Sequence, residues 1–451
     1  MTGGVRGRVP ETLHLRAHAA PRGALEKRAL VLGMTPLTDS APLVVARERG
    51  FFARHGLEVS LSVEPSWANV RDKLAAGEVD AAHLLAPVAL ALTLGAGPLH
   101  CPTLTALSLG ANGNAITVSR ALRRRLEEVA GAHDLADAAG CARALAALVA
   151  RDGVRGAPRL RLATVFPFSM HAYALRYWLA GAGIDPDRDV ELLVVPPPRM
   201  VERLAAGGID GFCVGEPWST LAVQRGVGSL LLPTYGIWSN APEKVLGVTL
   251  DWAERHPTTH LALVGALLEA AAWCDAPGNR DEVAHLLSAS GVIAAPEPAL
   301  LPSLRGALLR DDGIAPPEAE PLPDFHVFHR YAASFPWRSH AAWIAVQMLR
   351  WGQLEKPFDV RAAAAAVYRS DLHREAAARV GVDAPIDDEK REGDHDAPWT
   401  TPGRCGPIAM GVERFCDGAT FDPRDVVGAL ERSEIAHPLV RLDELARVQS
   451  R

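Results

Sequence analysis

Short apolar segments alternate with longer amphipathic segments in the first quarter of the chain. Residues 29–34 are apolar, residues 59–63 alternate apolar and polar side chains, and residues 81–85 form another short apolar run. Such runs predict strands, and period-two alternation is typical of a half-buried strand. The longer segments at 41–55 and 66–76 have helical character. Strands that alternate with helices predict a mainly parallel sheet with helices on both faces.

A second series of strands and helices follows an Ala- and Arg-rich helical region at 119–156. The pattern predicts strands at 160–166, 190–195 and 211–214, with helices between them. After Leu230 it indicates a return to the first sheet. The expected plan is two α/β lobes, the first of them discontinuous. Its parts are a disordered N-terminal arm (1–28), lobe I (29–118 and 231–386), lobe II (119–230) and a C-terminal extension packed on lobe I with a loop (387–451).

Two regions in the C-terminal third give further expectations. Residues 325–353 are rich in aromatic and histidine side chains, which predicts a packed helix. Residues 387–406 are charged and then rich in Pro and Gly, without any period. A segment of that composition predicts a long loop or a partly disordered tail.

Composition excludes several classes of protein. A chain of 451 residues is long enough for two or three domains, and 48% hydrophobic with 22% charged residues is typical of a soluble globular protein. The net charge of −6 gives no broad basic surface, so direct nucleic-acid binding is not expected. The six cysteines form no Cys-x-x-Cys pair, which argues against a zinc site and against a disulfide framework.

The N-terminal residues bear on where the protein works. Residues 1–28 contain five arginines and one lysine but no apolar run long enough for a secretory signal. No apolar stretch of the length of a membrane-spanning helix occurs later either, so no membrane insertion is expected. The chain as written is therefore expected in the cytoplasm. The alternative is a periplasmic location, if the start of the sequence is not the true start.

Polar side chains gather where the predicted strands end. Ser66 is a natural N-cap, so Trp67 is expected on a strand-to-helix turn, where free backbone N–H groups suit a small anion. The alternative is that Trp67 is a core residue. Ligands of open α/β sheets bind beyond the carboxyl ends of the strands and between domains. The residues expected there are Thr38, Asp39, Trp67, Asn114, His171 and Glu216.

Several motifs, in order from about residue 31 to about residue 422, resemble the nitrate/bicarbonate-binding proteins of bacterial ABC transporters. They are LTDSAPL at 37–43, SWANVRDKL at 66–74, AHLLAP at 82–87, RYWL at 176–179, PPPRMV at 196–201, GFCVGEPW at 211–218 and PEK at 242–244. The resemblance implies a two-lobed, type II periplasmic-binding-protein-like fold that closes on one small oxyanion.

The resemblance also implies roles for individual residues. It places the ligand beside Trp67, Asn114, His171 and Lys244, with Lys244 as the compensating cation. Asn114 stands where transporter relatives have a glutamine, which shortens the amide arm. His171 is preceded by the bulky segment 166–170, where relatives have glycines. Each of these residues has a plainer alternative: a turn asparagine, a helix-start histidine facing solvent, and a solvated lysine.

Two further residues are expected at the cleft. Pro197, in a run of three prolines, is expected to stiffen the backbone at its edge, with a main-chain contact to the ligand as a further option. Glu216 is expected to orient a ligand-binding donor or to support the hinge. Bicarbonate-binding relatives use calcium, but the sequence has no acidic cluster of the EF-hand type. Neither a metal nor a cofactor is therefore expected.

Three functions follow from the resemblance. The first expectation is a nitrate/nitrite sensor, as in the cytoplasmic branch of the family. Such a sensor controls an RNA-binding antiterminator protein by binding it in a way that depends on the anion. The alternative is the substrate-binding component of an ABC transporter for nitrate, bicarbonate or cyanate, with a permease as its partner. The third is an enzyme similar to the thiamin-pyrimidine synthases. No cysteine cluster or nucleophile–base pair supports it, so the chain is expected not to be an enzyme.

Overall fold

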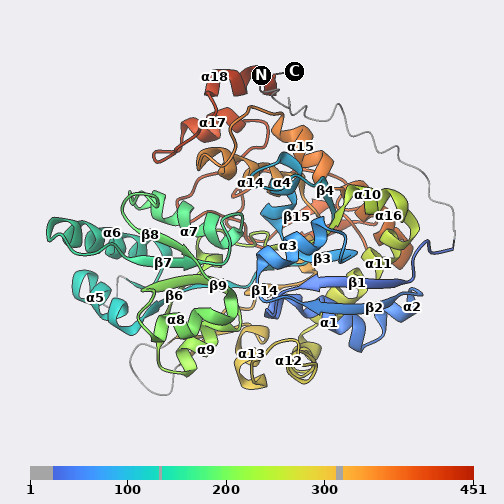
Figure 1. The fold of residues 1–451 in the computed structure, drawn as a ribbon, viewed down its shortest axis with the longest axis horizontal. Helices are drawn as coiled ribbons and strands as arrows, with labels where there is room; N and C mark the ends of the chain where they lie inside the picture. The colour runs from blue at the N-terminus through green and yellow to red at the C-terminus, as the bar shows by residue number, and fades with distance from the viewer. Residues whose placement is uncertain (1–23, 132–134, 311–317, 451) are drawn as a thin grey trace, which may run out of the picture.

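Two open five-stranded sheets form the core of the chain, for which a computed structural model describes residues 24–131, 135–310 and 318–450. The sheets lie side by side, each flanked by helices, as Figure 1 shows. The first has the order β2-β1-β3-β11-β4, and the second β10-β6-β9-β7-β8. The first comprises β1 (Ala29–Met34), β2 (Glu58–Val63), β3 (Ala81–Leu85), β4 (Thr103–Ser108) and β11 (Lys244–Thr249). The second comprises β6 (Asn114–Ser119), β7 (Arg161–Thr164), β8 (Glu191–Val194), β9 (Gly211–Gly215) and β10 (Gly228–Pro233). This confirms the predicted two-lobed α/β fold.

The strand directions are more mixed than the expected mainly parallel sheets. In the first sheet β1 runs parallel to β2 and β3, but β11 runs antiparallel to β3 and β4. In the second, β7 runs parallel to β8 and β9, but β6 runs antiparallel to β9 and β10. The reversed strands β6 and β11 are the ones that the chain enters after crossing from the other lobe. A strand entered from the other lobe starts at the edge where its neighbours end, and therefore runs against them.

The crossings between the lobes differ by a few residues from the expected division. β6 and the whole of β10 belong to the second sheet, although residues 114–118 and 231–233 were expected in lobe I. The chain therefore crosses before Asn114 and again between Pro233 and Lys244. Short pieces of structure occupy these crossings: β5 (Ala111–Asn112), which pairs with β14 (His326–Val327), and the 3-10 helix η4 (Thr234–Gly236).

Helices cover both sheets, and serine side chains start two of them at the edge between the lobes. Ser66 Oγ accepts from the backbone N–H of Asn69, and Ser169 Oγ accepts from that of Ala172. The first lobe carries α1 (Ala41–Glu48), α2 (Phe51–Arg54), α3 (Trp67–Ala75), α4 (Ala86–Leu94), α10 (Leu250–Arg255), α11 (Pro257–Asp275), α12 (Arg280–Ala289), α13 (Glu297–Leu304), α14 (Arg338–Arg350), α15 (Val360–Val367) and α16 (Ser370–Val380). The second lobe carries α5 (Arg120–Ala130), α6 (Ala138–Val154), α7 (Met170–Gly181), α8 (Met200–Ala205) and α9 (Trp218–Gln224).

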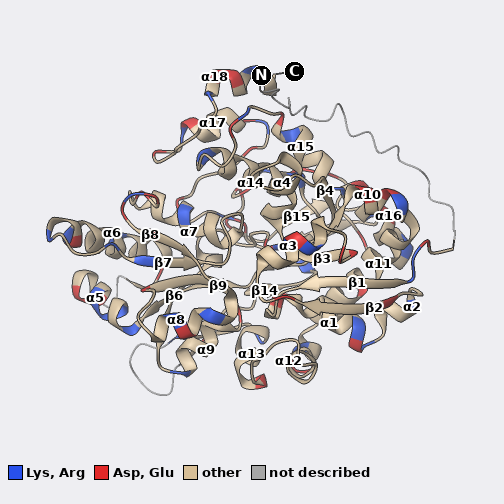
Figure 2. Cartoon of the chain, viewed as in Figure 1, with Lys and Arg blue, Asp and Glu red and all other residues tan. Residues whose placement is uncertain are grey.

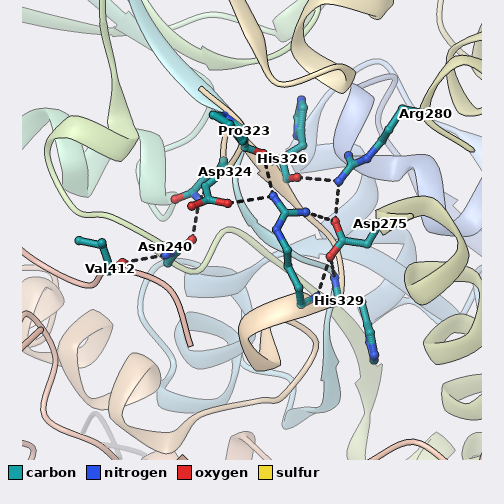
Figure 3. A network of polar contacts seen from close by, with 10 residues as sticks. Asn240, Asp275, Arg280, Pro323, Asp324, His326, His329 and Val412 are labelled. Atoms are coloured by element: carbon teal, nitrogen blue, oxygen red, sulfur yellow. Dashed lines mark hydrogen bonds and ion pairs between the residues drawn. The ribbon is translucent and has the colours of Figure 1, made fainter. Parts of the chain in front are cut away.

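The segment 325–337 is not the helix that its aromatic and histidine residues suggested. It holds the short strand β14 and the 3-10 helix η6 (Arg330–Ala332), and only α14 is an α-helix. Tyr331 has φ 62° and Ala332 φ 51°, values that no right-handed helix can contain. A polar network replaces the helical hydrogen bonds: Asp275 of α11 accepts from the backbone N–H groups of His329 and Arg330, as part of the contacts that Figure 3 shows.

The C-terminal extension is ordered and contacts both lobes. Its elements are β15 (Trp399–Pro402), β16 (Pro407–Met410), α17 (Val426–Glu431) and α18 (Leu442–Gln449), of which α17 and α18 are drawn in red at the top of Figure 1. Buried Lys390 forms ion pairs with Glu392 and Glu413, which fixes the segment expected to be a long loop or a partly disordered tail; it is an ordered loop up to β15. Phe415 packs against Trp343 of the first lobe and Tyr177 of the second, with ring centroids 6.0 and 5.4 Å apart. The extension thus packs on more than lobe I.

The expected N-terminal arm, 1–28, lies mostly outside the described residues, but its end is packed. Glu26 accepts hydrogen bonds from the first turn of α11, which lowers its pKa to about 2, and Lys27 pairs with Asp80 at 2.6 Å. Acidic and basic residues are scattered over both lobes in Figure 2. Within the described ranges no single helix could cross a membrane. Only one pair of consecutive helical segments, Pro257–Asp275 and Pro277–Ala289, is together long and apolar enough to span a membrane, and this pair is bent by 88°.

Candidate functional site

Lys244 lies at the centre of a buried polar cluster, at the end of the first sheet where strands β1 and β3 terminate. Its Nζ atom is 2.9 Å from Asp39 Oδ2 and 2.5 Å from Glu243 Oε1, and its side chain is 1% exposed. Asp39 follows β1 in the 3-10 helix η1 (Thr38–Ser40). Because β11 is antiparallel to its neighbours, its first residue, Lys244, lies at the edge where β1 and β3 end. The mixed sheet therefore brings the lysine to this edge.

The first lobe also contributes two aromatic side chains to the cluster, Trp67 and His83. The Trp67 ring, at the start of α3, lies 5.3 Å from the Lys244 ammonium and 5.6 Å from the His83 ring. His83 Nε2, from β3, is 3.2 Å from Asp39 Oδ1. The indole N–H of Trp67 is buried and has no hydrogen-bond partner among the described residues. It is a free donor beside a cation.

The second lobe supplies Asn114 and His171. Asn114 is the first residue of β6, and its Nδ2 donates to Glu243 Oε2 at 2.6 Å. His171, in the first turn of α7, places Nδ1 3.4 Å from Glu243 Oε1, while its Nε2 is buried without a partner in the part of the chain that is described. Glu243 therefore touches side chains of both lobes and of its own neighbour Lys244.

Glu216 joins the two lobes through its backbone. Its carbonyl oxygen accepts from the N–H of Thr38 at 2.8 Å, while its carboxylate accepts from the N–H of Thr220 at 3.1 Å. The peptide bond between Glu216 and Pro217 is cis. These contacts place Glu216 beside the cluster, where its backbone bridges the two lobes.

Burial and mutual contacts set the charges of the cluster. Burial alone would lower the pKa of Lys244, but Asp39 and Glu243 hold it above its usual value. Although burial opposes its charge, Lys244 and His83 keep the pKa of Asp39 well below normal. Burial raises the pKa of Glu243 despite its contact with Lys244, and raises that of Glu216 to about 7. Near neutral pH the cluster thus holds one cation and a firmly ionised Asp39.

Both histidines of the cluster are neutral near pH 7. Burial lowers the pKa of His83 and, with the nearby charge of Lys244, places that of His171 well below its usual value. A neutral imidazole carries one donor and one acceptor nitrogen. Each histidine can therefore give one N–H to a ligand, while Lys244 supplies the positive charge.

The structure brings together four of the six residues expected to bind the ligand: Trp67, Asn114, His171 and Lys244. Glu216 lies beside them and bridges the lobes through its backbone, so its role as an orienting or hinge residue stays a prediction. Pro197 is buried in the 3-10 helix η3 (Pro197–Arg199), and no described contact ties it to the cluster, so its role stays a prediction. The alternative for Trp67 is partly right as well, because its ring is buried and packs in the core of the first lobe.

Glu243 and His83 were not expected as site residues. Both lie inside the motifs that carry the family resemblance, and each has a recognisable feature: His83 interrupts the apolar run 81–85, and Glu243 directly precedes the lysine. Their contacts depend on which strands are neighbours, and β11 reaches β3 from a position far along the chain.

The cluster is closed in this structure. A cavity of about 10 Å³, with room for at most about one water molecule, lies beside Asn114 and Glu243. A nitrate-sized ion needs more room, so the lobes or the side chains have to move apart before it enters.

The cluster offers carboxylates but no ready cation site. Lys244 fills the position between Asp39 and Glu243 that a metal ion would need. The described residues do hold one group with the spacing of metal ligands, Asp185, Asp187 and His437, but it lies elsewhere, where the second lobe meets the C-terminal extension. The expectation of metal-free binding stays a prediction.

Comparison with known proteins relates this fold and cluster to a family. Residues 23–288 match the NMT1-like family. The chain is 39% identical over 431 residues to the nitrate import ATP-binding protein NrtC of Synechocystis sp., covering 95% of this chain and 58% of that protein. It thus spans little more than half of NrtC.

Two relatives match over most of their own length. The nitrate/nitrite binding protein NrtA of Synechococcus elongatus is 34% identical over 412 residues, or 89% of this chain and 85% of that protein. The crystal structure of the periplasmic nitrate-binding protein NrtA from Synechocystis superposes with a TM-score of 0.79 at 30% identity. That superposition covers 92% of this chain and 100% of the other.

Proposed function

The chain belongs to the NMT1-like family, among the substrate-binding proteins of ABC transporters, and on that premise we propose that it binds nitrate or nitrite between its lobes. The observation that carries the proposal is the convergence of Lys244 and Trp67 from one lobe with Asn114 and His171 from the other. We further propose that the protein acts in transport, because relatives matched over most of their length bear nitrate- or nitrite-binding names.

The chemistry of the cluster suits a small planar oxyanion. Nitrate carries one negative charge and three acceptor oxygens, so it needs a cation and a few oriented donors. Lys244 is the cation, and the free N–H of Trp67 and a ring N–H of His171 are donors without protein partners. Burying the ion without such partners would be costly.

Binding requires an exchange of partners. The ammonium of Lys244 already contacts Asp39 and Glu243, so the anion has to displace one carboxylate or share the ammonium with it. Glu243 is the better candidate to yield, because burial raises its pKa, whereas Asp39 is held ionised by Lys244 and His83. Protonated Glu243 could then donate to an oxygen of the ligand rather than repel it.

Isothermal titration calorimetry on chelator-treated protein tests the proposal. Sodium nitrate, sodium nitrite and sodium bicarbonate are titrated in turn. Sodium chloride is the control, because chloride carries the same single charge but is spherical and has no oxygen atoms. We expect nitrate or nitrite to bind at one site per chain without a metal. Binding of bicarbonate alone, or binding that appears only after calcium is restored, would contradict the proposal.

The sensor role expected from the sequence uses the same ligand site with a different partner. It stays a prediction, as does a cytoplasmic location. Fractionation of cells that express the native gene separates a cytoplasmic from a periplasmic protein. A pull-down with the permease subunits and with an RNA-binding antiterminator from the same operon, with and without nitrate, identifies the partner.

A further inference from the structure

A second cavity lies outside the cluster around Lys244, where both lobes meet the C-terminal extension. It has a volume of about 270 Å³, far larger than the cavity beside Asn114. Its walls come from α7 of the second lobe, α14 of the first lobe, the segment 415–421 and α17. None of the proposed nitrate-binding residues lines it.

The floor of this cavity is aromatic. Tyr177, Trp343, Phe415 and Phe421 line it, and the last three are 3–4% exposed. The Trp343 and Phe415 rings are nearly parallel, with an interplanar angle of 18° and centroids 6.0 Å apart. Such walls suit a flat apolar body.

A buried guanidinium lines the same cavity. Arg350 is 6% exposed, and its Nε donates to the carbonyl oxygen of Ile435 at 2.9 Å. No carboxylate in the described ranges forms an ion pair with it. The guanidinium carbon lies 5.7 Å from the Tyr177 ring and 4.6 Å from the Trp351 ring. The Asp417 carboxylate is near enough to favour its charge but forms no ion pair with it. Buried charges are normally paired, so a guanidinium without a direct ion-pair partner beside an open volume can take an anion.

We propose that this cavity, at the junction of both lobes and the C-terminal extension, binds a small organic carboxylate with a flat apolar body. The carboxylate pairs with Arg350, and the body lies against Tyr177, Trp343 and Phe415. The rim carries Asp417, Thr420, Arg432 and Glu434, all exposed, which leaves the far end of the ligand in a polar environment of mixed charge.

The position of the cavity connects it to the cluster around Lys244. Tyr177, Trp343 and Phe415 also line the small cavity beside Asn114 and Glu243. The same three rings therefore border the proposed carboxylate site and the small cavity at the Asn114 and Glu243 side of the cluster. A ligand here touches α7 and α14, one from each lobe.

The test uses benzoate as the probe and benzamide as its neutral isostere. Both are titrated calorimetrically into the full chain in the presence of excess nitrate, so that the Lys244 cluster is occupied if it binds nitrate. We expect benzoate to bind at least about ten-fold more tightly than benzamide, because a charge-assisted bond to the guanidinium is the stronger one. Arg350→Gln should remove this preference.

A second variant keeps the test decisive if Arg350→Gln does not fold. Ala419→Trp fills the cavity from its exposed rim and leaves Arg350 in place. Val154→Trp is the matched control, because it adds the same ring at a 91% exposed position outside the cavity. We expect Ala419→Trp to abolish benzoate binding and Val154→Trp to leave it unchanged. Equal affinity for benzoate and benzamide, or wild-type binding by Ala419→Trp, would overturn the proposal whether or not the protein binds nitrate.

Discussion

At the scale of single residues, the cluster around Lys244 contains more carboxyl groups than a simple anion-binding site needs. Asp39, Glu243 and Glu216 are all buried at or beside it, against one lysine and two neutral histidines. Inserting a further negative charge is favourable only if the carboxylates give up Lys244 or take up protons. Nitrate affinity should therefore depend on individual hydrogen-bond donors and, through the carboxyl groups, on pH.

The free indole N–H of Trp67 gives the first prediction. Trp67→Phe removes the donor but keeps a ring in the buried position, so the fold should persist. Losing one neutral hydrogen bond should weaken nitrate binding by about 1 kcal/mol, or roughly five-fold. Trp399→Phe is the control, since it removes another buried, unpartnered indole N–H in the C-terminal extension. Equal effects of the two substitutions on nitrate affinity would argue against a Trp67 contact.

Glu216 gives a prediction on pH. Its pKa is raised to about 7 by burial, so it is protonated below that pH and charged above it. Nitrate remains an anion throughout, and a neutral Glu216 repels it less. Affinity should therefore rise several-fold as the pH falls from 8 to 6. Glu243, whose pKa burial also raises, acts in the same direction, whereas the histidines do not contribute, because burial lowers the pKa of both.

Calorimetry at several pH values checks this prediction, with Glu216→Gln as the comparison. The glutamine is neutral at every pH and can still accept from the backbone of Thr220, so its affinity profile should be flatter. If the wild-type affinity for nitrate is constant between pH 6 and pH 8, the charge of Glu216 does not affect nitrate binding.

At the scale of elements, the buried ion pairs of Lys390 hold the C-terminal extension in place. Lys390→Met should destabilise the protein by about 3–5 kcal/mol near pH 8, because it leaves the buried Glu392 without its cation. Burial and the nearby Glu392 raise the pKa of Glu413 to about 8, so the effect should be larger above that pH, where Glu413 is also charged. Lys356→Met, at an exposed lysine, should change stability by less than about 0.5 kcal/mol. Urea unfolding measures both values. A small effect at Lys390 would mean that the glutamates are neutral in the folded protein.

The elements show what the sequence could reveal. Strands β1 and β3 were predicted with their observed ends, because short apolar runs bounded by turns are recognisable locally. Segment 325–337 was misassigned, because its conformation depends on a network that includes Asp275, about fifty residues earlier. The ordering of segment 387–406 likewise depends on the buried pairing of Lys390 with Glu413, which composition does not reveal.

The site shows the same limit. Trp67, Asn114, His171 and Lys244 could be grouped through a family resemblance, since each follows or begins a recognisable element. The partners of Lys244 could not be assigned, because strand order decides them: β11 reaches β3 and β4 only after the chain has built the second lobe. The excess of carboxylates emerged only from the folded arrangement.

At the scale of the whole molecule, two lobes and one extension meet around the aromatic rings of Tyr177, Trp343 and Phe415. An anion that contacts both lobes favours the closed arrangement by no more than its differential affinity for the two states. A carboxylate bound against α7 and α14 should favour the same arrangement. The two ligands should then strengthen each other, and by the same factor.

Paired titrations measure this coupling. Saturating benzoate should tighten nitrate binding several-fold, and saturating nitrate should tighten benzoate binding equally. Ala419→Trp, with its cavity filled, should bind nitrate with an affinity that benzoate does not change. Independent binding of the two ligands to the wild-type protein would show that the rings do not link the sites.

The most direct test of the account is nitrate binding by Lys244→Ala. Calorimetry on the chelator-treated variant should show a loss of about 2–5 kcal/mol of binding free energy, because the only cation within the described cluster is gone. Far-UV circular dichroism should remain that of a folded protein, and Lys356→Ala, at an exposed lysine, should bind as wild type does. Nitrate binding by Lys244→Ala with wild-type affinity would contradict the placement of the site.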